Sequence, residues 1–262
     1  MPRQENKLRL AHALKEALLK SYDIEAVILF GSLGRGDGDE FSDVDFLLVM
    51  ETEREADELS KEMMDYLAHL SQDVHIIVKS PREYHYQRDI PGTIIHSADR
   101  EGRILFDKKK WWEKDLPVES YELRKRAIIN HEYVESSYDF LKKAKTSLHE
   151  GNLFRCRDFT RFAVVRAIKG LFVRHDIHPP RELNLVKLYE AMSMLEPGLM
   201  DQGRRWIDEL NGYIPGNTGA GETQRMTDIL DETERFIKDM FKRYPYPSEN
   251  EHENHGRSAE EI

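Results

Sequence analysis

The sequence contains one cysteine, Cys156, among its 262 residues. A single thiol cannot form a disulfide within the chain, and such low cysteine usage is typical of proteins in a reducing cytoplasm. No apolar run approaches the ~20 residues that a membrane-spanning helix needs. The start of the chain, residues 1–7, is too polar for a signal peptide. We therefore expect a cytoplasmic protein that has no membrane partner.

Basic residues are also fewer than acidic ones. The 39 Lys and Arg residues are outnumbered by 49 Asp and Glu residues, which gives a formal net charge of −10. Duplex nucleic acid is bound mainly by basic side chains on phosphates, so this balance argues against a broad duplex-binding surface. A local basic strip is still compatible with it. Arg155, Arg157, Arg161 and Arg166 would form such a strip on one helix. It is either a solvated face paired with acids or a wall that binds phosphate or an acceptor.

Glycines and acids meet in one stretch, Gly31-Ser32-Leu33-Gly34-Arg35-Gly36 followed by Ser42-Asp43-Val44-Asp45. The apolar runs at 26–30 and 46–50 on either side predict two buried strands joined by a glycine-rich turn. Because strand side chains alternate faces, Asp43 and Asp45 would share a face, with Cα atoms about 6.6 Å apart. Two such carboxylates can bind a divalent cation, and glycine N–H groups can approach an anion. The stretch predicts a site for a nucleoside triphosphate with Mg²⁺.

The order Gly-Ser, Arg-Gly and then Asp-x-Asp on the next strand resembles the minimal nucleotidyltransferases of the polymerase β superfamily. The resemblance implies a site in which the glycine-rich stretch holds the triphosphate and the two acids bind Mg²⁺, for which Mn²⁺ could substitute. The implied nucleotide-binding residues are Gly31, Ser32, Arg35 and Gly36, and the implied metal ligands are Asp43 and Asp45.

Members of this superfamily usually carry a third carboxylate on the third strand, where it completes the metal site or accepts a proton from the attacking hydroxyl. In this chain the aligned position, on a strand predicted at 73–78, is His75. Asp73 lies two residues earlier on the same strand face and could substitute after a small register change. Neutral histidine can act as a base or bind a metal, although Mg²⁺ prefers oxygen. Either Asp73 or His75 is then catalytic beside Asp43 and Asp45, or nucleotide is bound without turnover.

The order of predicted elements gives an α+β fold class. A helix at 6–20 precedes the two strands, and a second helix begins at Glu51 or Thr52. The strand at 73–78 follows, and a turn and short last strand at 101–106 complete a small mixed sheet. We expect this nucleotidyltransferase core to occupy residues 1–110.

Helical periodicity dominates the remainder of the chain. After a connection at 111–118, residues 119–244 predict an all-α antiparallel bundle. The glycine-rich segment 212–221 should be a loop, and 245–262 should be a disordered tail.

The segment 163–188 of this half is similar to the HEPN bundle, through Ile168-Lys169-Gly170-Leu171-Phe172 and Pro179-Pro180-Arg181. Members that cleave RNA carry an Arg followed four to six residues later by His, late in the bundle. Late in the bundle this chain has no such pair, because His178 lies only four positions after Arg174, near the middle of the predicted bundle, and the next histidine, His252, lies in the predicted tail. A ribonuclease is therefore not expected. The helical bundle could also form a homodimer.

Together the two resemblances imply an enzyme, a Mg²⁺-dependent nucleotidyltransferase that moves a nucleoside monophosphate from an NTP, ATP foremost, to a hydroxyl. The acceptor is a small molecule, a protein side chain or an RNA end, and the sequence does not choose among them. The alternative is a catalytically weakened NTP-binding regulatory module of a toxin–antitoxin-like transferase/HEPN system, which contacts a protein or RNA partner.

Overall fold

The computed structural model describes residues 2–108, 118–181, 184–213 and 220–242. The chain divides into two compact units, Met1–Arg124 and Lys125–Ile262. Two clusters of buried apolar side chains lie in the first unit and one in the second, so each unit has a hydrophobic core of its own. The fold class is α+β, as the sequence predicts.

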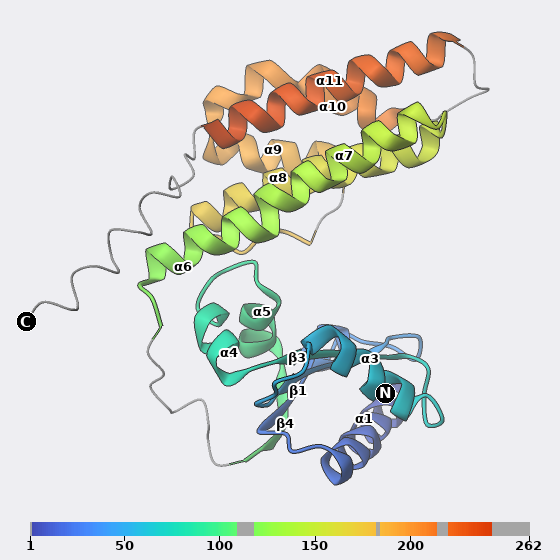
Figure 1. Cartoon of the computed structure of the whole chain (residues 1–262), viewed down its shortest axis with the longest axis vertical. Coiled ribbons are helices and arrows are strands. Elements are labelled where there is room, and N and C mark those ends of the chain that lie inside the picture. The colour runs from blue at the N-terminus through green and yellow to red at the C-terminus, as the bar shows by residue number, and fades with distance from the viewer. Residues whose placement is uncertain (1, 109–117, 182–183, 214–219, 243–262) are drawn as a thin grey trace, which may run out of the picture. The chain divides into compact units, whose positions relative to one another are not determined.

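A four-stranded mixed sheet forms the centre of the N-terminal unit (Figure 1). Its strands lie in the order β3-β2-β1-β4. β2 pairs antiparallel with β1 on one side and parallel with β3 on the other. β4 pairs antiparallel with the other side of β1. The strands are β1 (Ala26–Phe30), β2 (Val44–Val49), β3 (Val74–Lys79) and β4 (Arg103–Asp107).

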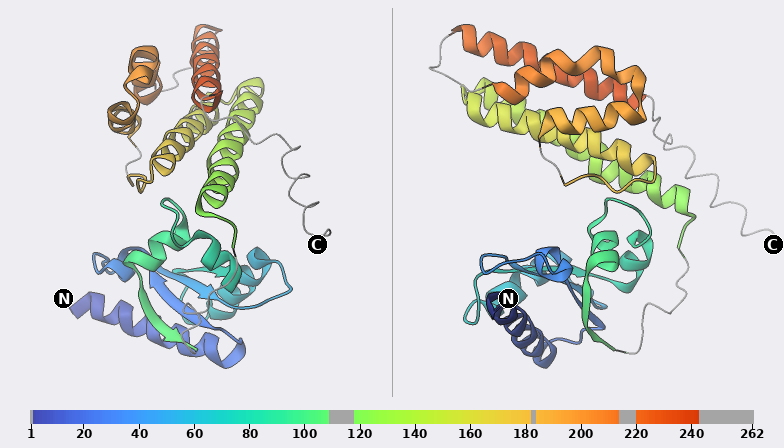
Figure 2. Two further views of the ribbon diagram at one scale, coloured as in Figure 1. Left: turned by 90° about the vertical axis from the view of Figure 1, so that its left-hand side faces the viewer. Right: turned by 180° about the vertical axis from the view of Figure 1, so that it is seen from behind.

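Helices cover both faces of this sheet (Figures 1 and 2). Alternate strand residues such as Val27 and Leu29 pack with α1 (Pro2–Ser21) and α3 (Ala56–Leu67). The intervening Ala26 and Ile28 pack on the other face, under α4 (Pro81–Gln87) and α5 (Ile94–Glu101). All four residues are at most 3% exposed, because β1, to which they belong, is covered on both faces.

Three local features differ from the sequence prediction. The glycine-rich turn is wound into a short helix, α2 (Gly31–Arg35), which ends where Gly36 adopts the left-handed conformation. α3 begins at Ala56 rather than at Glu51 or Thr52, because the Thr52 hydroxyl accepts the N–H of Arg54 and forms a turn instead. The stretch after β3 has no clear hydrophobic periodicity in the sequence, yet it contains two helices, α4 and α5.

A capping box explains why α4 forms. The Ser80 hydroxyl accepts the N–H of Glu83 at 3.1 Å, and the Glu83 carboxylate accepts the N–H of Ser80 at 2.8 Å. Pro81 occupies the first helical turn, where its missing N–H has no cost. The sequence Ser-Pro-x-Glu carries this signal.

The helical half is built from long helices that pack side by side (Figure 2). The first two helices, α6 (Tyr121–Ile128) and α7 (Ser136–His149), are joined by a π-helical segment, η2 (Ile129–Glu135). Gly170 packs closely against this segment, since a Cβ on Gly170 would lie 2.8 Å from the Cβ of Tyr133. The predicted loop at 212–221 is shorter in the structure, because helices include Gly212 and Gly221, and 214–219 lie outside the described residues. The helices are α6 (Tyr121–Ile128), α7 (Ser136–His149), α8 (Leu153–Arg174), α9 (Leu185–Leu195), the 3₁₀ turn η3 (Pro197–Leu199), α10 (Met200–Gly212) and α11 (Ala220–Lys242).

The predicted connection at 111–118, apart from its last residue, and the predicted tail at 245–262 fall outside the described residues. Within the part of the chain that is described, no helix combines the length and apolar character needed to cross a membrane.

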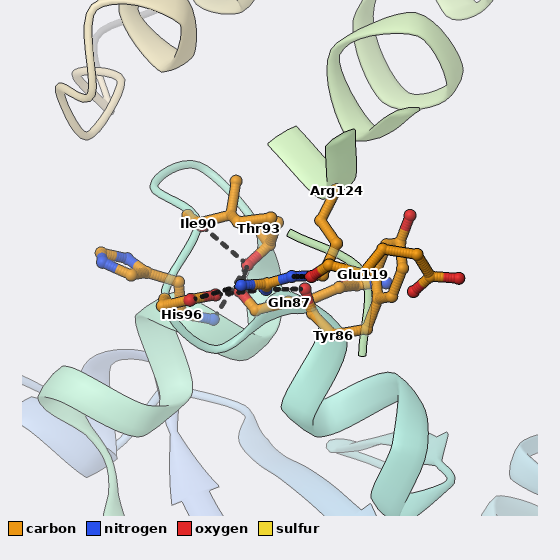
Figure 3. A network of polar contacts seen from close by, with 8 residues as sticks. Tyr86, Gln87, Ile90, Thr93, His96, Glu119 and Arg124 are labelled. Carbon is orange, nitrogen blue, oxygen red and sulfur yellow. Dashed lines mark hydrogen bonds and ion pairs between the residues drawn. The ribbon is translucent and has the colours of Figure 1, made fainter. Parts of the chain in front are cut away.

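Arg124, the last residue of the N-terminal unit, is the centre of a polar network (Figure 3). Its guanidinium, 6% exposed, forms two hydrogen bonds of 2.6 and 2.7 Å with the Asp89 carboxylate. It also donates to the carbonyl oxygens of Tyr86 at 2.6 Å and Glu119 at 2.8 Å. In the same network the Thr93 hydroxyl caps α5 by accepting the N–H of His96. Arg124 thus fixes the segment between α4 and α5 by bidentate pairing.

Candidate functional site

The turn out of β1 depends on a glycine. Gly31 has a φ of +67°, which is unfavourable for residues with a side chain. A Cβ built on Gly31 would lie 2.1 Å from Oδ2 of Asp45. Gly31 therefore lets the backbone at the start of α2 come directly against the Asp45 carboxylate.

The loop that follows α2 is wound around one carbonyl. The oxygen of Ser32 accepts the N–H groups of Gly36, Asp37 and Gly38 at 3.0, 3.1 and 3.0 Å. Gly36 has a φ of +88°, and a Cβ on Gly38 would lie 3.1 Å from both the carbonyl carbon of Ser32 and the backbone nitrogen of Leu33. The glycines of this stretch are needed for a tight return of the chain from α2 toward β2.

The two acids occupy the start of β2. Asp43 immediately precedes the strand, and Asp45 is its second residue, paired with Phe30 at the end of β1 and with His75 on β3. Nδ1 of His75 lies 3.3 Å from Oδ1 of Asp45 and 3.9 Å from Oδ2 of Asp43. The structure therefore brings the glycine turn, both carboxylates and the imidazole together at one end of the sheet.

The electrostatics of Asp45 reflect its position between these groups. Its side chain is 23% exposed, against 48% for Asp43 and 63% for His75. Burial raises the pKa of Asp45 above its ordinary value, the Asp43 charge adds to the rise, and the contact with His75 opposes it. A cation bound beside Asp45 would favour the ionised carboxylate, because an opposite charge nearby stabilises the charged form.

Asp73 is placed differently from His75. Its carboxylate is 62% exposed and forms an ion pair of 3.4 Å with Lys7 on α1. Among the described residues, no hydrogen bond or ion pair joins Asp73 to Asp43 or Asp45. His75, rather than Asp73, is the third-strand residue that contacts the two acids.

Arg35, at the end of α2, contacts acids of its own. Its guanidinium forms ion pairs with Asp37 at 3.1 Å and Glu101 at 3.7 Å, and its charge also acts to lower the pKa of Asp45. A contact from β4 also holds α2 in place, because Arg103 Nε donates a hydrogen bond of 3.0 Å to the Gly34 carbonyl. This contact joins residues that are 69 positions apart, so no local pattern in the sequence could indicate it.

The donor atoms at this site suit Mg²⁺ with a nucleotide rather than a metal held by protein alone. Mg²⁺ is usually bound through one or two carboxylates, with substrate phosphates and water as the other ligands. Asp43 and Asp45 supply two carboxylates, and Gly31, which has no Cβ, lets the backbone approach the Asp45 carboxylate directly. In the described part of the chain, no group of three His, Cys, Asp or Glu side chains is arranged to hold a metal.

The N-terminal half of the chain contains a nucleotidyltransferase-family domain. Residues 12–110 match the family model described as "Polymerase beta, Nucleotidyltransferase". The predicted resemblance of the N-terminal half is thereby confirmed, whereas that of the helical half to HEPN bundles stays a prediction. No curated protein matches the chain at a significant level.

Two solved structures match most of the chain at low identity. The first is a nucleotidyltransferase-like protein from Exiguobacterium sibiricum 255-15, with 11% identity, a TM-score of 0.44, and coverage of 88% of this chain and 74% of the other. The second is the spectinomycin adenyltransferase AAD(9) from Enterococcus faecialis, solved with ATP and spectinomycin. It has 13% identity, a TM-score of 0.43, and coverage of 89% of this chain and 99% of the other.

Proposed function

We propose that this protein is a Mg²⁺-dependent nucleotidyltransferase that transfers a nucleoside monophosphate from ATP or another NTP to a hydroxyl acceptor. One observation supports the proposal most strongly. Asp45 lies against the backbone of Gly31 and contacts His75, at the end of the sheet where Asp43 also lies. In this reaction the acceptor hydroxyl attacks the α-phosphorus, the bond to the β-phosphate breaks, and pyrophosphate leaves.

Each residue of the site has a role that its position supports. The backbone at Gly31 and Ser32 would bind the triphosphate through N–H groups, and Asp43 and Asp45 would hold Mg²⁺. When bound, Mg²⁺ neutralises charge on the phosphates. His75 orients Asp45 through the 3.3 Å contact and is our candidate for the third-strand position, ahead of Asp73. The enzyme would act mainly by positioning and charge stabilisation.

A second function, nucleotide binding without turnover, is favoured by one observation. The third-strand position at the two acids is taken by an imidazole, and no carboxylate there contacts them among the described residues. A regulatory module of this kind would bind ATP with Mg²⁺ and release no pyrophosphate. Its partner would be a protein or an RNA.

The test is transfer of label from ATP labelled at the α-phosphate to a panel of hydroxyl acceptors that includes small molecules, protein and RNA ends. Release of pyrophosphate is measured in parallel, because it reports turnover independently of the acceptor. We expect label transfer and pyrophosphate release that require Mg²⁺. Asp43→Asn should abolish both, since it removes one of the two carboxylates that we propose hold Mg²⁺.

Asp65→Asn is the matched control, because Asp65 is an exposed acid on α3 in the same unit. It should retain wild-type transfer. Equal transfer by Asp43→Asn would contradict the proposal. Mg²⁺-dependent ATP binding without pyrophosphate release across the panel would favour the regulatory module.

A further inference from the structure

Phe41 is an exposed aromatic residue next to the candidate site. It lies in the loop between α2 and β2, two residues before Asp43, so their Cα atoms are at most about 7 Å apart. Its exposed fraction is 83%, against 37–54% for nearly all other large apolar side chains that are exposed in the described chain. A single exposed apolar residue is common on a protein surface. The position of this one, beside Asp43, makes it a candidate for contact with a ligand.

The backbone of Phe41 is held by contacts that do not involve its ring. The Asp39 carboxylate accepts the N–H of Phe41 at 3.0 Å and the hydroxyl of Ser42 at 3.0 Å. The N–H of Asp39 donates in turn to the Ser42 hydroxyl at 2.9 Å. Hydrogen bonds from Phe41 and Ser42 lower the pKa of Asp39, so its carboxylate stays ionised and able to accept them.

The other end of this loop follows Gly31 and Ser32, whose backbone we propose binds the triphosphate. The Ser32 carbonyl fixes Gly36, Asp37 and Gly38 through three hydrogen bonds, and the Asp39–Ser42 contacts follow directly. The loop is therefore tied at both ends while the ring of Phe41 stays in water. A ring on a pre-ordered backbone loses little conformational entropy when a ligand covers it.

We propose that Phe41 is the stacking platform for the nucleobase of the bound NTP. This inference rests on the proposed function, because it takes the phosphates to lie at Gly31 and Ser32 with Mg²⁺ at Asp43. Every nucleobase has an apolar π-face, so an exposed phenyl ring can stack on any of them without reading hydrogen-bond donors and acceptors. Affinity should then follow the stacking area, with purine nucleotides binding more tightly than pyrimidine nucleotides.

The experiment compares the binding of Mg²⁺·ATP with that of Mg²⁺·tripolyphosphate, which has the phosphates and no base. Calorimetric titration of the full chain gives both dissociation constants for wild type and for Phe41→Ala, Phe41→Leu and Phe41→Tyr. We expect Phe41→Ala and Phe41→Leu to weaken ATP binding about 5- to 100-fold, as at other base-stacking sites, and to leave tripolyphosphate binding unchanged. Phe41→Tyr retains a π-face and should keep near wild-type affinity for both.

A second readout reports stacking directly. In Phe41→Trp, ATP should quench the fluorescence of the new indole relative to wild type, and tripolyphosphate should not. Phe154→Ala, which removes a 54% exposed phenyl ring from the helical half, is the matched control and should bind ATP as wild type does.

Two results separate the failure of this inference from failure of the proposed function. Unchanged ATP affinity in Phe41→Ala, or wild-type affinities that are equal for ATP and tripolyphosphate, would overturn the role of Phe41 while leaving the phosphate and metal site intact. Failure of wild type to bind either ligand with Mg²⁺ would instead overturn the proposed function itself.

Discussion

Replacement of Gly31 by alanine tests the geometry of the site most sharply. Two separate costs should arise. The first is backbone strain, since a φ of +67° costs a residue with a side chain about 1–2 kcal/mol. The second is the clash of the new Cβ with Oδ2 of Asp45, from which it would be only 2.1 Å away.

Relief of this clash requires the Asp45 carboxylate to rotate. Rotation would weaken its contact with His75 and place the side chain outside its preferred rotamer, for a further loss of about 1–2 kcal/mol. The total loss of unfolding free energy in Gly31→Ala should be about 2–4 kcal/mol. Binding of Mg²⁺·ATP should fall as well, because one of the two metal ligands is displaced.

Gly36→Ala provides the control in the same loop. Gly36 has a φ of +88°, but a Cβ there would meet only the far end of the Arg103 side chain, at 2.8 Å, and that side chain can move. We expect this variant to lose about 1–2 kcal/mol, the cost of strain alone.

The assay is urea unfolding monitored by circular dichroism, with the transition of each unit fitted separately because the chain has two. In an Asp45→Ala background the cost of Gly31→Ala should fall to that of Gly36→Ala, since the nearest remaining atom, Cβ of residue 45, is 3.4 Å away. A loss in Gly31→Ala that equals that in Gly36→Ala, and that does not change in the Asp45→Ala background, would refute the reasoning.

Three further predictions concern other parts of the chain. Arg124→Ala should destabilise the N-terminal unit by about 2–3 kcal/mol in urea unfolding, because it leaves two carbonyls and the Asp89 carboxylate without their donor. Burial raises the pKa of Asp89, but Arg124 outweighs it and the folded-state pKa is lowered, so this pair stabilises the fold above the unfolded pKa of about 3.9. That stabilisation should be lost as pH falls through the folded pKa, and Asp89→Asn should remove this acid dependence. Burial raises the pKa of Cys156 to about 11, so Ellman's reagent at pH 8 should label the thiol only as the helical unit opens; rapid labelling of native protein would contradict its burial. Asn184→Ala should cost about 1 kcal/mol, measured by thermal unfolding, because the Asn184 side chain caps α9 through the N–H groups of Val186 and Lys187.

The strands of the N-terminal unit could be predicted from the sequence because they are short apolar runs beside turn residues. The proximity of the acids to Gly31 could be predicted in part, since Asp43 and Asp45 follow the glycine stretch by only a few residues. The helical conformation of 31–35 could not, because it depends on the left-handed backbone at Gly31 and Gly36. Glycine permits that conformation without specifying it.

Other features depend on contacts between residues far apart in the chain. The sequence left Asp73 and His75 as alternatives, because the choice depends on the pairing of β2 with β3. That pairing places His75 directly beside Asp45, while α1 supplies Lys7 as the partner of Asp73. The network of Arg124 has the same origin, since no local pattern predicts that α6 contacts the segment after α4. By contrast, the Ser80 capping box is a local signal from which α4 could have been predicted.

We propose that Gly31, Asp43 and Asp45 form one site for a triphosphate and its metal ion. The most direct test is the calorimetric titration of ATP into wild type with and without Mg²⁺, followed by the same titration of Asp45→Asn and of Asp65→Asn as control. We expect wild type and Asp65→Asn to bind ATP only when Mg²⁺ is present, and Asp45→Asn to lose at least tenfold in affinity. ATP binding of equal strength in Asp45→Asn, or binding that does not respond to Mg²⁺, would contradict this proposal.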